Sequence, residues 1–187
     1  QTKDIDKDKL KEIKKETKIT DNLKNPIIIK SGKNKIKSEK GLEKIIYLQL
    51  NDFFSQLGSG FTWVGNQYKI SVDGNDYYID LLFYHLELRC YIVVELKVNK
   101  FKPEYTGQLG FYVTAIDETL RTKNDNPTIG LLLCKDKDRL SVDWSLKSTN
   151  VPIGVSSFKV KNIIPKNILD KLPTEEDLNM HINLDNH

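Results

Sequence analysis

Apolar and polar residues alternate along the chain with periods that change from one segment to the next. Over residues 41–57, GLEKIIYLQLNDFFSQL, apolar side chains recur about every 3.6 residues, which predicts an amphipathic helix that ends at Gly58. Residues 61–72 and 77–85 read as strands joined by a turn at DGND, and residues 90–98 as a third strand after the turn at LELR. The first half of the domain is therefore expected to be a helix followed by three antiparallel strands.

The second half continues with alternating helices and strands. Pro103 opens a predicted helix over 104–121, and the continuously apolar run 127–135 is typical of a covered central strand. A short helix over 142–148 and a last strand over 152–158 complete the order. The strand–helix–strand unit from Tyr91 to Cys134 should be a right-handed crossover, so its two strands should be parallel. We therefore predict an α/β fold with a central mixed sheet flanked by helices.

Length and charge divide the chain into three parts. A chain of 187 residues suits one domain with flanking segments. We expect a Lys-rich arm or linker over 1–40, a single domain over 41–160 and a polar, peripheral tail over 161–187. The net charge of +3 hides an asymmetry, because residues 1–44 carry +6 and the remainder −3. A basic arm beside an acidic body suits nucleic acid, although solvated lysines in a Lys-rich sequence explain it equally well.

Other features of the sequence bear on the compartment. No apolar run is long enough for a membrane span, and no secretory signal is present at the N-terminus. Cys90 and Cys134 both sit in apolar runs without metal-like spacing, which predicts buried, reduced thiols in a cytoplasmic protein without a membrane partner. Because the sequence does not begin with Met, we expect a domain upstream of it. A homodimer is left open.

A candidate site emerges from the middle strands. Glu95 and Lys97 alternate with Leu96, so both point to the same side of their strand. Pairing across the LELR turn should place Asp80 opposite Glu95, and two carboxylates so close repel each other unless a cation or a proton lies between them. The alternative is an ordinary ion pair of Asp80 with Lys97, with Glu95 exposed at the strand end.

Two helices provide further candidates. Glu43, in the first predicted helix, could supply a third carboxylate, although Glu is also common in first turns because it complements the helix dipole. Gln108 and Tyr112 are four residues apart and therefore share a helix face. They could act at a phosphate, or they could be a buried pair that satisfies itself.

These residues, in this order, resemble a known nuclease signature. Asp80, then Glu95-Leu96-Lys97, then Gln108 with Tyr112 are similar to the PD-(D/E)xK motif and its QxxxY extension. The order of elements resembles the restriction-endonuclease-like αβββαβ core. The phrases YYIDLLFYH, ELKVNKFKPEYTGQLGFY and DNPTIGLLLCK resemble the nuclease domain of the bacterial YhcG family, over about residues 41–158. Ile79 stands where the signature's name has Pro.

The resemblance implies a metal-dependent endonuclease, a hydrolase of phosphodiester bonds that acts on DNA. It implies Mg²⁺ or Mn²⁺ as the cofactor, which agrees with a set of hard carboxylate oxygens and no Cys/His cluster. The implied metal ligands are Asp80, Glu95 and Glu43. The other implied catalytic residues are Lys97, Gln108 and Tyr112.

Positive side chains near the motif are candidates for phosphate contacts. We name Lys100, Lys102 and His85 as nucleic-acid-binding residues, beside the alternatives that the lysines are only solvated and that the histidine is structural. Two other functions use the same fold. One is a catalytically silent module that binds nucleic acid or a protein, and the other is an RNA-directed endonuclease.

Overall fold

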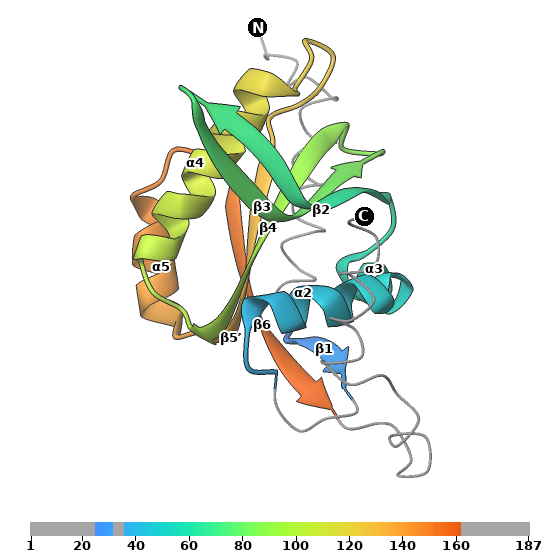
Figure 1. Ribbon diagram of the computed structural model, residues 1–187. Coiled ribbons are helices and arrows are strands. Elements are labelled where there is room, and N and C mark those ends of the chain that lie inside the picture. Colours follow the sequence, from blue (N-terminus) through green and yellow to red (C-terminus); the bar gives the residue numbers. More distant parts are fainter. Residues whose placement is uncertain (1–24, 32–35, 162–187) are drawn as a thin grey trace, which may run out of the picture.

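The computed structural model describes residues 25–31 and 36–161, which form a mixed sheet covered by helices (Figure 1). The sheet has six strands in the order β1-β6-β5-β4-β3-β2. The strands are β1 (Ile27–Lys30), β2 (Phe61–Val72), β3 (Asn75–His85), β4 (Cys90–Lys100), β5 (Ile129–Asp136) and β6 (Ile153–Lys161). The described helices are α2 (Glu39–Leu48), α3 (Leu50–Leu57), α4 (Glu104–Thr119) and α5 (Arg139–Lys147).

The strand directions agree with the sequence. Strands β2, β3 and β4 are antiparallel neighbours, whereas β4, β5 and β6 run parallel. The predicted parallel pairing across the β4–α4–β5 crossover is therefore confirmed, as is the α/β class.

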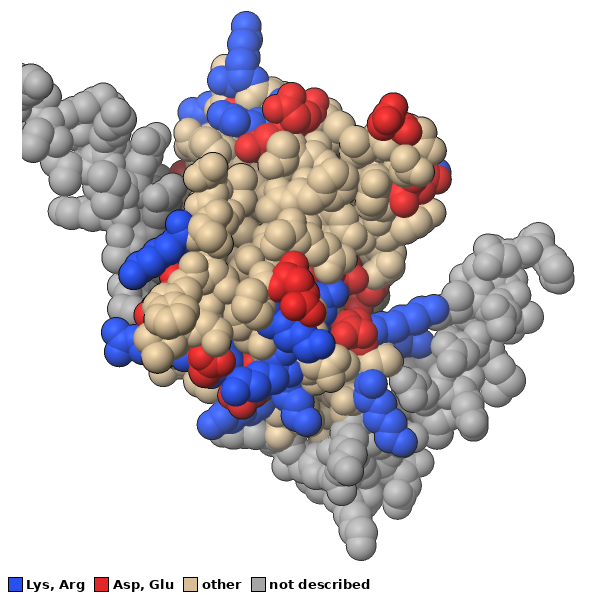
Figure 2. All heavy atoms as spheres, turned by 90° about the vertical axis from the view of Figure 1, so that its left-hand side faces the viewer, with Lys and Arg blue, Asp and Glu red and all other residues tan. Residues whose placement is uncertain are grey.

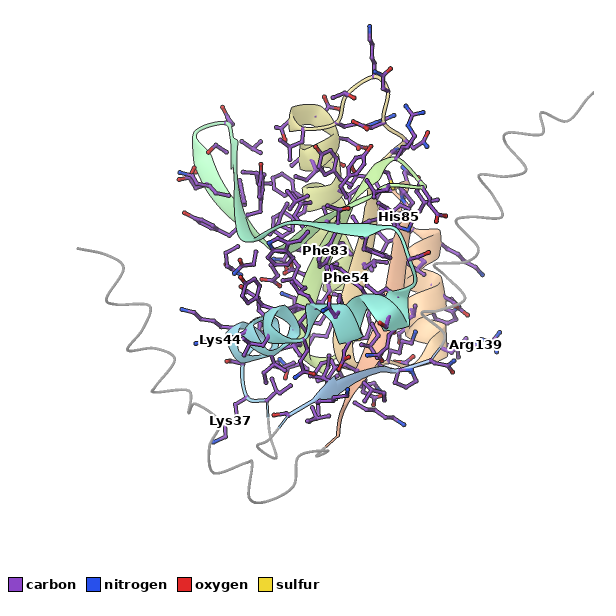
Figure 3. All side chains as sticks on the ribbon, turned by 90° about the vertical axis from the view of Figure 1, so that its right-hand side faces the viewer. Lys37, Lys44, Phe54, Phe83, His85 and Arg139 are labelled. Carbon is purple, nitrogen blue, oxygen red and sulfur yellow. The ribbon has the colours of Figure 1, made fainter. Side chains whose placement is uncertain are left out.

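Helices cover both faces of the sheet, and each face has its own core. On one face α2 and α3 pack on Ile92, Leu96 and Phe83, all fully buried. Figure 3 shows Phe83 and Phe54 between the sheet and α3, and their rings meet edge to face at 5.3 Å. On the other face α4 and α5 cover a second cluster that includes Val93 and Leu132. Cys90 and Cys134 are buried, as predicted.

The predicted helix over 41–57 is in fact two helices, and this expectation is corrected. The helix is interrupted at Gln49, between α2 and α3. Its φ of −123° and ψ of 31° are not helical. The Gln49 side chain bonds the backbone of Lys30, accepting from its N–H and donating to its carbonyl. Gln56 does the same at Ile28, at 2.6 and 3.0 Å. The two amides satisfy the outer edge of β1, which has no further strand beside it in the part of the chain that the structure describes.

Strand β1 also corrects the expected domain boundary. Residues Ile27–Lys30 pair in parallel with residues 158–161 of β6, so part of the segment expected as an arm belongs to the sheet. Gly41, the expected start of the domain, lies inside α2. Two parts of the expected arm, residues 1–24 and 32–35, lie outside the described residues. The tail beyond Lys161 lies outside them as well.

An irregularity lies where β2 crosses β3. The register shifts between Trp63 and Gly65, and Gln67 has a positive φ of 44° inside the strand. Along β3 the usual alternation breaks at the same level, because Ile79 packs in the α4 core and Leu81 in the α2–α3 core. The irregular stretch is centred on Asp80.

No helix among the described residues is long and apolar enough to cross a membrane.

Candidate active site

Asp80 is fixed to the neighbouring strand by a backbone hydrogen bond. The N–H of Leu96 donates to Asp80 Oδ2 at 2.8 Å, and the regular pairing of β3 with β4 runs up to Leu81 opposite Val94. One step further along this register lies Glu95. The antiparallel hairpin thus brings Asp80 level with Glu95 and Lys97, as the sequence predicts.

Glu95 is buried with one oxygen satisfied and the other not. Its side chain is 4% exposed, and Oε1 accepts a 2.9 Å hydrogen bond from Lys97 Nζ. Oε2 is buried without a hydrogen-bond partner. Because an unsatisfied buried oxygen on a carboxylate is costly, this position calls for a proton or a cation. The alternative in which Glu95 is exposed at a strand end is therefore excluded.

Burial and mutual repulsion make the two carboxylates poor acids. Burial, and next the charge of Asp80, raise the pKa of Glu95 to about 7. Burial also raises the pKa of Asp80, and the charge of Glu43 raises it further. The hydrogen bonds from Leu96 and Gln67 lower this pKa, but they do not cancel the effect of burial. Near neutral pH the pair therefore holds a proton easily.

Lys97 remains a cation in this environment. Burial lowers its pKa, but the hydrogen bond and charge of Glu95, together with the charges of Asp80 and Glu39, outweigh burial, so the net pKa is raised. The ammonium also lies 5.3 Å from the centre of the Tyr105 ring on α4. Lys97 is thus a proton-bearing donor at this site and cannot serve as a base near neutral pH.

The third carboxylate, Glu43, reaches the site through amide side chains. It is buried on α2, and its two oxygens accept from Asn66 Nδ2 at 2.7 Å and from Gln67 Nε2 at 2.6 Å. Gln67 Nε2 also donates to Asp80 Oδ1 at 3.1 Å. The amide of Gln67 therefore connects Glu43 with Asp80.

The donor set suits a hard divalent cation, although the ligands are not gathered. Among the described residues no three His, Cys, Asp or Glu side chains are close enough to form a ready metal cluster. Hydrogen bonds explain this separation, because Gln67 stands between Glu43 and Asp80. The residues nevertheless fit such an ion, since Glu95 offers a buried, unpartnered oxygen beside a second carboxylate.

Gln108 and Tyr112 form the pair that their spacing predicts. Gln108 Nε2 donates to the Tyr112 hydroxyl at 3.3 Å, and Tyr112 is buried in the middle of α4. The ring of Tyr105, one turn before Gln108 on the same helix, faces the Lys97 ammonium. Helix α4 thus contacts the site through Tyr105, and the roles of Gln108 and Tyr112 in the reaction remain predictions.

Comparison with known proteins agrees with this arrangement. A family model described as "YhcG PDDEXK nuclease domain" matches residues 20–173, which is most of the chain. The chain belongs to the YhcG PDDEXK nuclease family. The core is accordingly restriction-endonuclease-like, and the three residues that resemble the D, E and K of the PDDEXK signature, Asp80, Glu95 and Lys97, lie on β3 and β4.

One curated relative is similar over much of the chain. It is the "Putative nuclease YhcG" of Escherichia coli (strain K12), 34% identical over 135 residues, or 72% of this chain. The matched region covers 36% of that protein, so this chain spans about a third of its relative.

Two solved structures are similar at lower identity. A repair endonuclease from Pyrococcus abyssi is 14% identical, with a TM-score of 0.48 over 68% of this chain and 49% of that one. The apo form of EndoMS is 17% identical, with a TM-score of 0.43 over 72% of this chain and 50% of that one.

The predicted phosphate-binding residues fall in two different places. Lys100 and Lys102 are exposed where β4 leads into α4, with loose ion pairs to Asp138 at 3.7 Å and Glu104 at 3.8 Å. Figure 2 shows Lys and Arg gathered over the lower part of the α4–α5 face, with Asp and Glu among them. The two lysines therefore remain candidates for contact with a polyanion.

His85 does not belong to the site, and this prediction is wrong. It is 4% exposed, its Nδ1 accepts from the Leu88 N–H at 3.2 Å, and its ring meets Phe61 edge to face at 4.8 Å. Figure 3 shows His85 on the opposite side of the view from Lys44, the neighbour of Glu43. The imidazole is a packing and turn-forming group of the β3–β4 hairpin.

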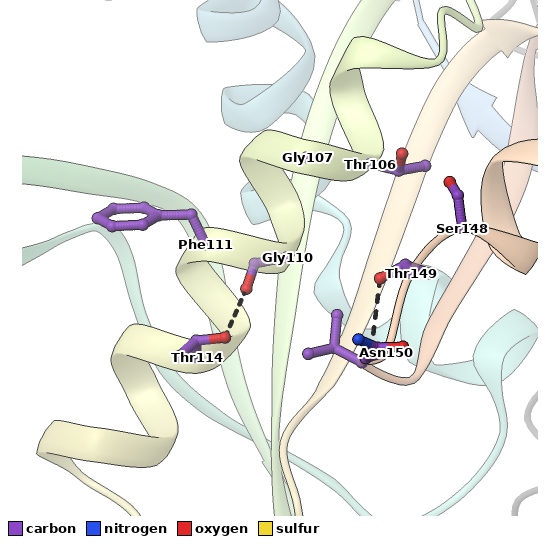
Figure 4. A pocket seen from close by; sticks show the side chains of 9 residues that line it. Thr106, Gly107, Gly110, Phe111, Thr114, Ser148, Thr149 and Asn150 are labelled. Carbon is purple, nitrogen blue, oxygen red and sulfur yellow. Dashed lines mark hydrogen bonds between the residues drawn. The ribbon is translucent and has the colours of Figure 1, made fainter.

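A groove on the far side of α4 lies apart from the carboxylates. It has a volume of about 380 Å³ between α4 and the loop after α5, and Figure 4 shows Thr106, Gly110, Phe111 and Asn150 on its walls. Its lining contains no acidic, basic or histidine side chain. The groove therefore offers none of the groups that phosphodiester chemistry requires.

Sequence reasoning missed three residues of the site. Asn66 and Gln67 are consecutive amides in a strand, where Asn is disfavoured, and this signal could have found them. Glu39 lies one turn before Glu43, and its Oε1 accepts from the Val98 N–H at 3.3 Å. The i, i+4 spacing of the two glutamates on one helix face was available in the sequence.

Proposed function

We propose that this domain is a metal-dependent nuclease that hydrolyses phosphodiester bonds, and that it acts on DNA as an endonuclease. The observation that carries the proposal is the buried, unpartnered Oε2 of Glu95 beside Asp80. An ordinary ion pair between Glu95 and Lys97 has no use for a second, unsatisfied carboxylate at the same place. A site that receives a cation and a phosphate does.

Asp80 and Glu95 are the residues proposed to hold Mg²⁺ or Mn²⁺, with Glu43 as a further ligand. Such an ion, when bound, neutralises phosphate charge and acidifies a water molecule. The chain orients these ligands through the Leu96 N–H on Asp80 and the Lys97 ammonium on Glu95. Both contacts fix carboxylate oxygens that would otherwise be free to turn.

Lys97 is proposed to act as a donor to the attacking water or to the developing phosphate charge. Its raised pKa keeps the ammonium protonated, and the ammonium lies 5.3 Å from the centre of the Tyr105 ring. A fixed positive group in a partly buried site stabilises negative charge better than a solvated one does. Gln108, near the start of α4, is proposed to approach the phosphate or its water from the same helix.

Lys100 and Lys102 are proposed to contact the nucleic-acid backbone as it leaves the site. Their side chains are more than half exposed, and their ammonium groups make loose ion pairs, so they are available to phosphates. Such contacts would position the substrate without reading its sequence.

A substrate panel tests the proposal. The protein is incubated with supercoiled plasmid, branched DNA, single-stranded DNA and RNA, each with Mg²⁺, with Mn²⁺ and with EDTA. Nicking or linearisation of plasmid that requires the ion supports a DNA endonuclease. Cleavage confined to RNA would redirect the proposal to an RNA-directed enzyme. Ion-independent binding without any cleavage would favour a silent binding module instead.

A further inference from the structure

Gln67 lies between two acidic side chains that come from different elements. Its Nε2 donates to Glu43 Oε2 at 2.6 Å and to Asp80 Oδ1 at 3.1 Å. A primary amide nitrogen carries two hydrogens, so these bonds use its whole donor capacity. The amide oxygen cannot take this position, because it would face two anionic oxygens. The carboxamide thus joins two groups that would otherwise repel each other.

The backbone of Gln67 is held in an unusual conformation to reach this position. Its φ of 44° lies in the left-handed region, inside a strand, where a residue other than glycine is strained. The pairing of β2 with β3 includes Asn66 with Leu81 and Tyr68 with Ile79. Gln67 falls between them at the level of Asp80. The irregularity aims the side chain at the carboxylates.

The hydrogen bonds distribute the free oxygens unequally among the three acids. Both oxygens of Glu43 are bound by amides, from Asn66 at 2.7 Å and from Gln67. Glu95, by contrast, is 3% exposed as a residue and keeps Oε2 without a partner. Asp80 resembles Glu43 in this respect, because its Oδ1 accepts from Gln67 and its Oδ2 from the Leu96 N–H. A cation entering the site therefore meets the unpartnered oxygen of Glu95 first, and it competes with the Gln67 amide for the oxygens of Asp80 and Glu43.

We propose that Gln67 is a positioning residue that latches Glu43 to Asp80 and thereby sets the affinity of the site for a divalent cation. The inference rests on the proposed function, because it takes Asp80 and Glu95 as the place where the cation binds. A neutral amide balances two carboxylates less completely than a cation does, so an ion can displace it at a cost in affinity. Without the latch, that cost disappears.

Calorimetric titration with Mn²⁺ and thermal melting test the latch in two Gln67 variants and one control variant. Gln67→Met keeps the length of the side chain without its donors, and Gln67→Gly removes the side chain while tolerating a positive φ. We expect both to bind Mn²⁺ about tenfold tighter than the wild type, the effect of losing one or two charge-assisted hydrogen bonds that compete with the ion. Gln67→Met should also melt at a lower temperature than the wild type in EDTA, and Mn²⁺ should raise its melting temperature by more.

Gln56→Met is the matched control, because among the described residues the Gln56 amide bonds only backbone groups, at Ile28 and Asp52. It should keep the wild-type Kd for Mn²⁺ even if it melts earlier. If the wild type binds Mn²⁺ and both Gln67 variants bind it equally or more weakly, the latch is wrong and the proposed function stands. A wild type that shows neither heat nor a melting shift with Mn²⁺ would overturn both. If Gln67→Met does not fold, Gln67→Gly decides alone.

Discussion

The N–H of Leu96 holds the carboxylate of Asp80 at 2.8 Å, so the backbone of one strand positions an acidic side chain of the next. Leu96 itself is fully buried under α2 and α3, and this makes its amide a rigid anchor. The residues on either side of Leu96, Glu95 and Lys97, point to the opposite face of the strand. One bond thus ties the acid of β3 to both site residues of β4.

Lys97→Met should reduce the cleavage rate by about a hundredfold or more, since it removes a fixed positive group from a partly buried site. Methionine keeps an unbranched apolar side chain and removes the ammonium that lies 5.3 Å from the centre of the Tyr105 ring. Lysine does not ligate metal, so the Kd for Mn²⁺ should be no weaker than that of the wild type. Single-turnover cleavage and calorimetry on the same preparation measure the two effects.

Lys100→Met is the control on the same strand. Its ammonium is exposed and pairs loosely with Asp138. We expect it to weaken binding to nucleic acid and to reduce the salt slope of binding by about one unit, with little change in the single-turnover rate at saturation. If the two variants lose rate equally, Lys97 has no special place in the reaction.

Stability in EDTA should fall as pH rises through the range between about 4.5 and 7. Burial and the charge of Asp80 raise the pKa of Glu95 from 4.5 to about 7, so in this range the folded protein binds more protons than the unfolded chain. The raised pKa of Asp80 acts in the same direction. The full Glu95 shift corresponds to about 3 kcal/mol of unfolding free energy, complete above pH 7. Urea unfolding at pH 5, 6, 7 and 8 measures it.

Glu95→Gln isolates this effect, because the glutamine stays neutral. Relative to the wild type, the variant should gain on the order of 2–3 kcal/mol of unfolding free energy between pH 5 and pH 8 in EDTA. It should also lose Mn²⁺ binding. Parallel pH curves for the two proteins would show that Glu95 is ionised at no cost in the folded state.

Gln56→Met should destabilise the fold by about 1–2 kcal/mol, because the N–H and carbonyl of Ile28 lose their partner at the outer edge of β1. Ser55→Ala is the neighbouring control, since the Ser55 hydroxyl bonds only the carbonyl of Asn51, one turn earlier in the same exposed stretch. Its effect should stay within about 0.5 kcal/mol. If chemical denaturation shows that Gln56→Met and Ser55→Ala lose the same free energy of unfolding, the Gln56 amide does not support β1.

Gly130→Ala should cost about 1–3 kcal/mol, the usual range for overpacking. A Cβ at Gly130 would lie 2.9 Å from Leu109 Cγ and 2.9 Å from Val113 Cγ2, so α4 must move away from β5. Gly107→Ala is a control on α4 itself, because nothing lies within 4 Å of its added Cβ. That change should be neutral or stabilising in a thermal melt. A neutral Gly130→Ala would contradict the close contact of helix and sheet.

The elements that the sequence predicts well are those fixed by local pattern. Strands β2, β3 and β4 follow from period-two alternation and two tight turns, and the hairpin register alone brings Asp80 near Glu95. The break at Gln49 could not be seen, because apolar spacing continues through it. It depends on an amide contact with Lys30, nineteen residues away.

The rest of the site depends on similar long-range effects. Gln67 reaches Asp80 only because a register shift near Val64 and a positive φ change the side to which β2 points. No local pattern encodes that geometry. His85 was misplaced for a related reason, since nearness to Asp80 in sequence becomes separation along a strand that rises about 3.4 Å per residue.

The central claim is that Asp80 and Glu95 form a site for ion-dependent cleavage of nucleic acid. Its most direct test is plasmid cleavage in Mn²⁺ by the wild type and by Asp80→Ala, together with fluorescence anisotropy of DNA binding in EDTA on the same folded preparations. We predict cleavage by the wild type only, and binding by both proteins. If folded Asp80→Ala cleaves at the wild-type rate, the carboxylates and lysine between β3 and β4 are an ordinary ion-pair network and the proposed site is wrong.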